Sequence, residues 1–182
     1  SILGSTGSIG TSTLDVVEAL PDRLAVVALA AGRNRERLRA QCERFRPACV
    51  SIQEAEDAAW LRTALSYAPE VHCGSEGLMA CALHPDADTI VAAVVGAAGL
   101  ASTEAALRAG RRVCVANKES LVVGGELMHQ ALKAGGGELL PVDSEHAALH
   151  QLLDGRAAGS VREVRITASG GPFRDWPLER IQ

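Results

Sequence analysis

The chain has 182 residues, of which 47% are hydrophobic, 22% charged and 3% aromatic, and its net charge is −4. This composition is typical of a globular protein with an aliphatic core. The negative charge, without a dense run of Lys or Arg, argues against nucleic-acid binding. The longest uncharged stretch, 89–103, is too short to span a bilayer, and no secretory leader precedes the first predicted strand. We therefore expect a soluble, cytoplasmic protein that does not bind membranes.

Predicted strands and helices alternate along the chain with short connections. This pattern is typical of a parallel sheet with helices on both faces, an α/β fold. Strands are predicted at 2–3, 24–30, 48–52, 89–95, 112–116, 138–142 and 161–168, and a short strand or loop at 69–73. Helices are predicted at 11–20, 34–45, 54–65, 76–83, 100–109, 119–134 and 144–153.

The first strand is followed by a glycine-rich loop, Gly-Ser-Thr-Gly-Ser-Ile-Gly at 4–10, and then by a helical run. Strand, glycine loop and helix form the first unit of a dinucleotide-binding fold. The glycines let the backbone approach a pyrophosphate, and the N–H groups that begin the helix face that anion. The spacing G-x-x-G-x-x-G is looser than the common G-x-G-x-x-G. A turn that binds nothing is therefore the alternative interpretation.

A second part of the cofactor site is predicted after the strand at 24–30, in the sequence Gly32-Arg33-Asn34-Arg35. Folds that select NAD place a carboxylate near this point, which binds the ribose 2′-hydroxyl. Here no carboxylate follows the strand before residue 36, and two arginines flank the position. Arginine favours the 2′-phosphate of NADP. The alternative is that both arginines only occupy the solvated first turn of a helix.

Polar residues also follow the strand at 112–116, in the sequence Asn117-Lys118-Glu119-Ser120. Asn117 fits a helix cap. A lysine at the same sheet edge as the glycine loop can neutralise or polarise a substrate oxygen. We therefore interpret Lys118 as a candidate substrate-binding residue.

Two carboxylates follow the next predicted strand, in the sequence Asp143-Ser144-Glu145-His146. Alternate residues of an extended backbone point the same way, so Asp143 and Glu145 can converge on Mg²⁺ or Mn²⁺. Considered alone, the segment fits the start of a helix better, with Asp143 or Ser144 as the cap. His146 and His150 have zinc-like spacing, but no Glu follows His146 directly, so we interpret them as surface residues.

A Ser and two glycines, Ser169-Gly170-Gly171, follow the last predicted strand. Successive N–H groups in such a segment can form a concave site for phosphate. A plain turn before Pro172 explains the same residues.

Six sequence blocks, in this order, resemble the 1-deoxy-D-xylulose 5-phosphate reductoisomerase family. They are G-S-T-G-S-I-G, A-G-R-N, V-G-A-A-G-L, A-N-K-E-S-L, P-V-D-S-E-H and S-G-G-P-F-R. The blocks extend over the whole chain, and A-N-K-E-S-L and P-V-D-S-E-H are specific to that family. The resemblance implies a Rossmann-like, doubly wound parallel sheet that binds NADPH over 1–142. It also implies that 143–182 begin an α+β catalytic domain.

The family activity implied by the resemblance is an NADPH- and divalent-metal-dependent isomeroreduction. It converts 1-deoxy-D-xylulose 5-phosphate, a small phosphosugar, to 2-C-methyl-D-erythritol 4-phosphate in non-mevalonate isoprenoid biosynthesis. Family members are usually homodimers. Both ends of the chain look cut, so we expect a fragment that is inactive alone, because further metal- and phosphate-binding residues would lie beyond it.

The resemblance also implies roles for individual residues. NADPH contacts are implied for Thr6, Gly7, Ser8, Ile9, Gly32, Arg33, Asn34, Asn117 and Glu119. Metal ligands are implied at Asp143 and Glu145, which with Lys118 form the catalytic set. Substrate contacts are implied for Lys118, Ser144, Glu145 and Ser169.

Two other functions remain compatible with the glycine loop. A reductase of the semialdehyde dehydrogenase type would need a nucleophilic cysteine near a strand end, and alkylation would abolish its activity. A non-catalytic dinucleotide-binding module would bind NADPH, and substitution of Asp143 and Glu145 would change nothing. A short-chain reductase is disfavoured, because it needs a Lys four residues after a Tyr and Val71 follows Tyr67 at that spacing.

Overall fold

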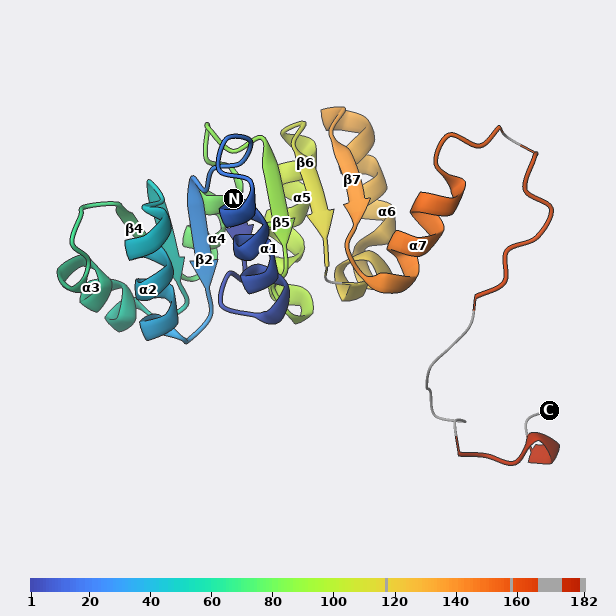
Figure 1. Cartoon of the computed structure of the whole chain (residues 1–182), viewed down its shortest axis with the longest axis horizontal. Coiled ribbons are helices and arrows are strands. Elements are labelled where there is room, and N and C mark those ends of the chain that lie inside the picture. The colour runs from blue at the N-terminus through green and yellow to red at the C-terminus, as the bar shows by residue number, and fades with distance from the viewer. Residues whose placement is uncertain (117, 158, 167–174, 181–182) are drawn as a thin grey trace. The chain divides into compact units, whose positions relative to one another are not determined.

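The computed structural model describes residues 1–116, 118–157, 159–166 and 175–180 (Figure 1). These residues belong to two compact units, Ser1–Asp143 and Ser144–Gln182. None of the described helices combines the length and the apolar composition that crossing a membrane requires.

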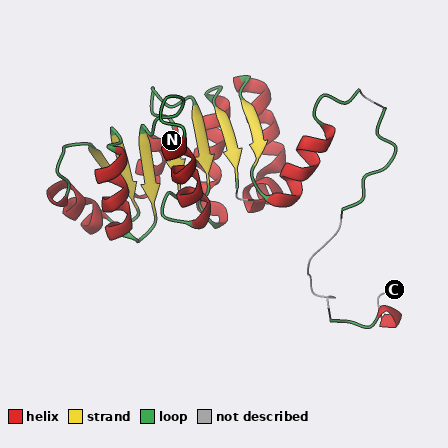
Figure 2. Ribbon diagram, viewed as in Figure 1, coloured by secondary structure: helices red, strands yellow, loops and turns green. Residues whose placement is uncertain are grey.

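The first unit contains one sheet of seven parallel strands in the order β4-β3-β2-β1-β5-β6-β7 (Figure 2). The strands are Ile2–Leu3 (β1), Ala28–Ala31 (β2), Cys49–Ile52 (β3), Glu70–Cys73 (β4), Thr89–Ala92 (β5), Arg112–Val115 (β6) and Glu138–Pro141 (β7). The predicted Rossmann-like parallel sheet is confirmed.

Helices connect successive strands on both faces of this sheet (Figure 1). They are Ser8–Ala19 (α1), Arg35–Phe45 (α2), Ala55–Ala64 (α3), Gly74–Ala82 (α4), Leu100–Arg108 (α5) and Lys118–Gly135 (α6). A short 3₁₀ turn, Gly96–Gly99 (η1), precedes α5.

Alternating side chains of the strands build a separate core on each face. Ile2 and Leu29 pack in the core covered by α1, α2 and α3. Their neighbours Leu3, Ala28 and Ala30 pack in the core covered by α4, α5 and α6. All five are at most 3% exposed, which explains why these strands read as continuous apolar runs. Burial of each leucine contributes roughly 2 kcal/mol.

The direction of the winding reverses beside β1. From β1 the chain moves to β2 on one side, whereas from β5, the other neighbour of β1, it moves to β6 in the opposite direction. In open parallel sheets, ligands bind outside the carboxyl ends of the strands at such a reversal. The loops after β1 and β5 therefore flank the expected ligand crevice.

Two predicted strands differ most from the structure, and the run predicted at 89–95 is a strand only over Thr89–Ala92. The run at 24–30 becomes a strand only over 28–31, because the ladder with β3 covers those four residues and β1 pairs with two of them. Residues 161–166 form no strand, and 167 and 168 lie outside the described residues. A strand requires a partner, and the described part of the second unit contains no other strand that could pair with it.

The second unit begins with the helix Ser144–Leu153 (α7), which has the bounds that the sequence predicts. Its other described helix is the 3₁₀ turn Leu178–Arg180 (η2). α7 buries none of its residues, and Leu152 and Ile166 are 65% and 64% exposed. The described residues of this unit thus form no core of their own.

Candidate functional site

The glycine loop lies at the carboxyl end of β1, where two of its glycines permit very close packing. Gly4 has φ +93°, and a Cβ atom there would lie 2.5 Å from the carbonyl oxygen of Ala93, just after β5. A Cβ atom on Gly10 would lie 2.3 Å from the carbonyl oxygen of Gly4. Real Cβ atoms do not approach backbone so closely, so the loop, β5 and α1 can meet in this way only with glycine at both positions.

The first turn of α1 is open to an anion. Gly7 is the N-cap and supplies no side-chain hydrogen bond, and no acidic residue occupies the first turn. The backbone N–H and the hydroxyl of Thr11 both donate to the Gly7 carbonyl. The first N–H groups of a helix have no partner inside it, and they carry the positive end of the helix dipole. The predicted contact residues Thr6, Ser8 and Ile9 lie at this point.

Of the three predicted NADPH contacts after β2, Asn34 also has a structural role. The side-chain oxygen of Asn34 accepts a hydrogen bond from the Arg37 N–H at 3.1 Å, so Asn34 caps α2. Gly32 and Arg33 are exposed. In the described part of the chain, the Arg33 side chain makes no hydrogen bond or ion pair, so its charge is available to a ligand.

The second arginine of this segment is already engaged. Arg35 pairs with Asp57 of α3 at 2.9 Å, and its guanidinium lies 4.8 Å from the centre of the Trp60 ring. A side chain held by an ion pair and a ring is less available to a phosphate. Of the two arginines that the sequence offered, Arg33 is therefore the better candidate for the 2′-phosphate.

Sequence reasoning missed a buried polar pair beneath the glycine loop. The hydroxyl of Ser5 donates to Gln41 Oε1 at 2.8 Å, and Gln41 Nε2 donates back to the Ser5 carbonyl at 2.8 Å. Ser5 is fully buried and Gln41 is 9% exposed. The available signal was a glutamine between Leu38 and Cys42 on the apolar face of α2.

The predicted substrate lysine lies at the carboxyl end of β6, in the first turn of α6. Lys118 and Glu119 begin this helix, whereas Asn117 lies outside the described residues. Of the other predicted substrate contacts, Ser169 also lies outside them. The backbone thus brings Lys118 to the same sheet edge as the glycine loop, two strands along from β1.

The predicted metal carboxylates follow β7. Asp143 is half-buried and ends the first unit, and Glu145 is exposed in the first turn of α7. The hydroxyl of Ser144 donates to Glu145 Oε2 at 2.9 Å. The argument that an extended backbone aligns residues 143 and 145 is wrong, because the helix begins at Ser144. Among the described residues, no group of three His, Cys, Asp or Glu side chains forms a ready-made metal site.

All seven parallel strands end at one edge of the sheet, and the loops after β2, β1, β5, β6 and β7 form the part of it that we call the binding edge. Adjacent strands lie about 4.8 Å apart, so the loop after β7 is roughly 14 Å along this edge from the glycine loop. The edge carries the predicted cofactor residues at one end and Asp143 at the other. An extended ligand along it would meet both.

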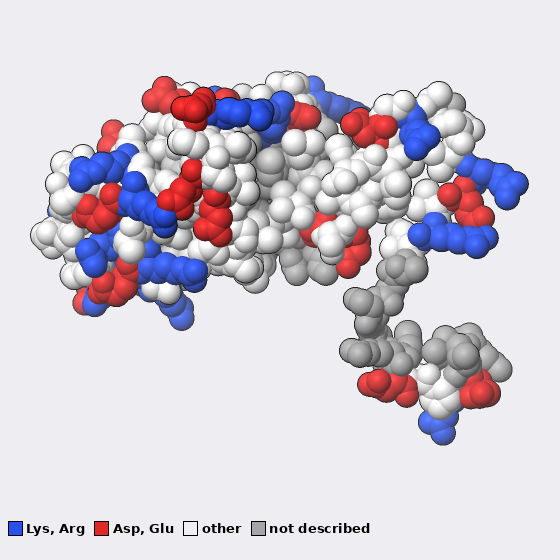
Figure 3. Space-filling view, viewed as in Figure 1, with Lys and Arg blue, Asp and Glu red and all other residues white. Residues whose placement is uncertain are grey.

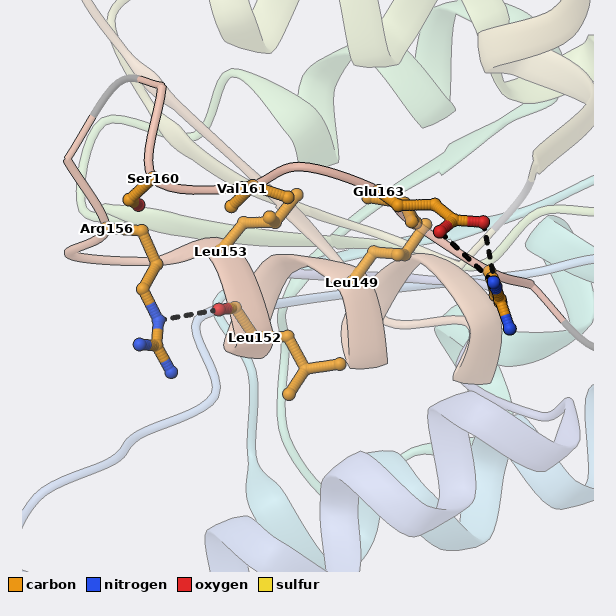
Figure 4. Close-up of a pocket in the computed structure, with 9 residues that line it drawn as sticks. Leu149, Leu152, Leu153, Arg156, Ser160, Val161 and Glu163 are labelled. Carbon is orange, nitrogen blue, oxygen red and sulfur yellow. Dashed lines mark hydrogen bonds and ion pairs between the residues drawn. The ribbon is translucent and has the colours of Figure 1, made fainter.

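A hollow of about 310 Å³ in the second unit involves none of the predicted site residues (Figure 4). Leu149, Leu152 and Leu153 of α7 and Val161 from the following segment give it an apolar lining. At its rim, Arg165 pairs with Glu163 at 2.8 Å. His146 and His150 of the same helix are exposed, as expected for surface residues.

A family model for 1-deoxy-D-xylulose 5-phosphate reductoisomerase matches residues 1–125. The chain belongs to this family. A second model, for the C-terminal domain of 1-deoxy-D-xylulose 5-phosphate reductoisomerase, matches residues 139–182. The resemblance that six sequence blocks indicated is confirmed, and membership of this family argues against the semialdehyde dehydrogenase alternative.

Curated relatives carry the same family name. The chain is 52% identical over 182 residues to 1-deoxy-D-xylulose 5-phosphate reductoisomerase of Geobacter metallireducens, covering 100% of this chain and 47% of the relative. It is 48% identical to the protein of that name from Thermosynechococcus vestitus, covering 100% of this chain and 45% of the relative. The chain thus spans about half the length of the curated relatives it matches.

Solved structures of the family share the fold. The enzyme from Zymomonas mobilis in complex with NADPH superposes with a TM-score of 0.90 at 44% identity, covering 98% of this chain and 47% of that one. A reductoisomerase in complex with NADPH, fosmidomycin and magnesium gives a TM-score of 0.79 at 42% identity, covering 82% and 37%. Both structures contain NADPH, and the second also contains magnesium.

Proposed function

We propose that this chain forms the NADPH-binding part, and the start of the catalytic part, of a 1-deoxy-D-xylulose 5-phosphate reductoisomerase. The whole enzyme isomerises and reduces 1-deoxy-D-xylulose 5-phosphate to 2-C-methyl-D-erythritol 4-phosphate in non-mevalonate isoprenoid biosynthesis. We place the boundary between the two parts at residues 142 and 143. The enzyme acts in the cytoplasm as a homodimer.

One observation carries the proposal: the loop Gly4–Gly10 opens α1 at the reversal point of a parallel sheet, and only glycine fits at both ends of the loop. A pyrophosphate fits this geometry because free N–H groups and the helix dipole favour an anion there. Arg33 at the neighbouring strand end supports NADPH over NADH. The solved family members that contain NADPH support the same cofactor.

The donor set at the other end of the edge fits a hard divalent ion. Asp143 and Glu145 offer carboxylate oxygens, the ligands that Mg²⁺ and Mn²⁺ prefer, and further oxygens must come from substrate, water or a third carboxylate. A bound metal supplies Lewis acidity at neighbouring hydroxyl and carbonyl oxygens of the substrate. The solved family members with magnesium support this assignment.

The chain's own residues then bind and orient the reactants. Lys118 supplies positive charge near the substrate oxygen on which negative charge develops. Ser144 and Ser169 donate hydrogen bonds to the substrate, Ser169 at its phosphate. Asn117 and Glu119, beside Lys118, contact the cofactor toward its nicotinamide end, so hydride donor and acceptor meet at one sheet edge.

The test uses a protein that carries this segment at the full length of the relatives. NADPH absorbance is followed with 1-deoxy-D-xylulose 5-phosphate, with and without Mn²⁺. Oxidation of NADPH is expected only when both substrate and metal are present. Absence of metal-dependent oxidation, with binding of NADPH intact, would support the non-catalytic dinucleotide module instead.

A further inference from the structure

The carbonyl groups of the glycine loop are all directed at donors within the protein. The Gly7 N–H donates to the Gly4 carbonyl at 3.1 Å, and the Thr11 N–H donates to the Gly7 carbonyl at 3.0 Å. Between them, the carbonyls of Ser5 and Thr6 accept hydrogen bonds from side chains of α2. Four consecutive carbonyl oxygens are therefore turned away from an anion at the loop.

The two donors of α2 are Arg37 and Gln41, which lie four residues apart on one face of the helix. Arg37 NH1 donates to the Thr6 carbonyl at 3.1 Å, and Gln41 Nε2 donates to the Ser5 carbonyl at 2.8 Å. Gln41 is buried, whereas Arg37 is exposed beside the loop. One helix face thus holds two adjacent peptide groups of the loop.

Because these loop carbonyls accept hydrogen bonds within the protein, the N–H groups of the loop remain available to a ligand. In the described part of the chain, the backbone N–H groups of Thr6, Ser8 and Ile9 make no hydrogen bond. Anion sites in proteins are built from such groups at the start of a helix. The orientation of the Thr6 peptide group, which Arg37 helps to hold, is part of this arrangement.

Arg37 differs from the other arginines of α2 in its charge balance. Arg35 pairs with Asp57, Arg39 with Glu36 and Arg44 with Glu18. Among the described residues, Arg37 has no carboxylate partner and binds only the neutral Thr6 carbonyl. Figure 3 shows how closely the two signs of charge alternate over the part of the surface that carries α2. An unneutralised cation that touches the loop favours an anion there.

We propose that Arg37 is a positioning residue for the cofactor pyrophosphate: it fixes the Thr6 peptide group and adds positive charge beside the loop. This inference rests on the proposed binding of NADPH. It differs from the role of Arg33, which concerns the 2′-phosphate. Because NADPH and NADH share the pyrophosphate, Arg37 strengthens the binding of both by the same factor.

The experiment compares Arg37→Gln, Arg37→Lys and the control Arg39→Gln in a protein of the relatives' full length. Dissociation constants for NADPH and NADH are measured by nicotinamide fluorescence. Arg37→Gln is expected to weaken both cofactors by about tenfold, the size of one charge-assisted hydrogen bond. Arg37→Lys retains the charge and should remain within about threefold of the original protein. Arg39→Gln should bind as the original does, because Arg39 pairs with Glu36 on the surface.

Steady-state kinetics give a second readout. The KM for NADPH should rise in Arg37→Gln, whereas kcat at saturating NADPH should be unchanged. Unaltered binding in Arg37→Gln overturns the proposal, and so does a loss confined to NADPH, which would assign Arg37 to the 2′-phosphate. Equal losses in the Gln and Lys variants overturn the role of the charge. Failure of the unsubstituted protein to bind either cofactor overturns the proposed function itself, and this inference with it.

Discussion

The two ends of the binding edge are built very differently. At the glycine-loop end, β1, β2 and α2 meet over two cores, and hydrogen bonds from Arg37 and Gln41 hold the loop. At the carboxylate end, Asp143 is half-buried, Glu145 is exposed, and α7 buries no residue. The described residues therefore complete the glycine loop but provide only two carboxylates for the proposed metal site.

The difference reflects what each kind of site requires. A pyrophosphate site needs backbone N–H groups in a fixed turn, which one strand–loop–helix unit provides. A divalent ion needs six or more oxygen ligands, which two neighbouring carboxylates do not supply. Substitutions at each end should accordingly separate cofactor binding from catalysis.

The largest effect is expected at the carboxylate end. In a protein of the relatives' full length, Asp143→Asn or Glu145→Gln should lower metal-dependent turnover by about a thousandfold or more, since several kcal/mol of charge stabilisation depend on the metal. Affinity for NADPH should stay within about twofold, because the contacts proposed for its pyrophosphate and 2′-phosphate lie at the other end of the binding edge. Turnover assays and fluorescence titration measure the two effects.

Asp154→Asn is the matched control, since this exposed carboxylate follows α7 and has no predicted role. It should leave both turnover and NADPH affinity unchanged. A protein that turns over normally without the Asp143 carboxylate would contradict the metal assignment.

The next effect compares a buried leucine of the first unit with an exposed leucine of the second. Leu29 is fully buried between helices and sheet, whereas Leu152 is 65% exposed on α7. Leu29→Ala should lower the free energy of unfolding by about 2–5 kcal/mol, the usual cost of a cavity. In this chain, Leu152→Ala should change it by less than about 0.5 kcal/mol. Urea unfolding followed by circular dichroism gives both values, and a comparable loss for Leu152 would reveal a core in the second unit.

Local sequence patterns predicted most strands and helices of the first unit, because their positions follow from the order of apolar, polar and glycine residues within short segments. Apolar runs located the strands, and strand–loop–helix order located the glycine loop. The start of α1 was missed, because Gly10 reads as loop and becomes helical only through its close packing on Gly4. Propensity disfavours glycine in a helix, so tertiary packing decided this boundary.

Features that depend on distant residues could not be predicted. The bond between Gln41 and Ser5 joins residues 36 apart in sequence, and no periodic pattern encodes it. The strand expected at 161–168 needs a partner, and its apolar residues alone do not supply one. The ion pair between Arg35 and Asp57 likewise could not be predicted, because it depends on α2 lying beside α3.

A smaller effect is expected when a methyl group is added at the tight backbone contact inside the glycine loop. In Gly10→Ala, the new methyl would meet the Gly4 carbonyl and the Ser5 backbone, which cannot move without disturbing the loop. Overpacking of this kind costs about 1–3 kcal/mol, and NADPH affinity should fall with it.

Gly125→Ala in α6 is the control, because nothing lies within 4 Å of its Cβ position. It should stabilise the protein by about 0.5–1 kcal/mol in thermal unfolding. Equal behaviour of the two variants would show that the contact does not constrain the loop.

The smallest effect tests cofactor choice at the glycine-loop end. Arg33→Gln removes an exposed positive charge that has no partner among the described residues. The dissociation constant for NADPH should rise by about tenfold, or 1.4 kcal/mol, while that for NADH stays unchanged. Preference for NADPH therefore falls in Arg33→Gln, whereas in Arg37→Gln it should persist while both affinities fall. Arg23→Gln, in the exposed turn after α1, serves as the control and should alter neither constant. If Arg33→Gln instead weakens NADH as much as NADPH, the 2′-phosphate is recognised elsewhere, and Arg33 contributes only general positive charge to the edge.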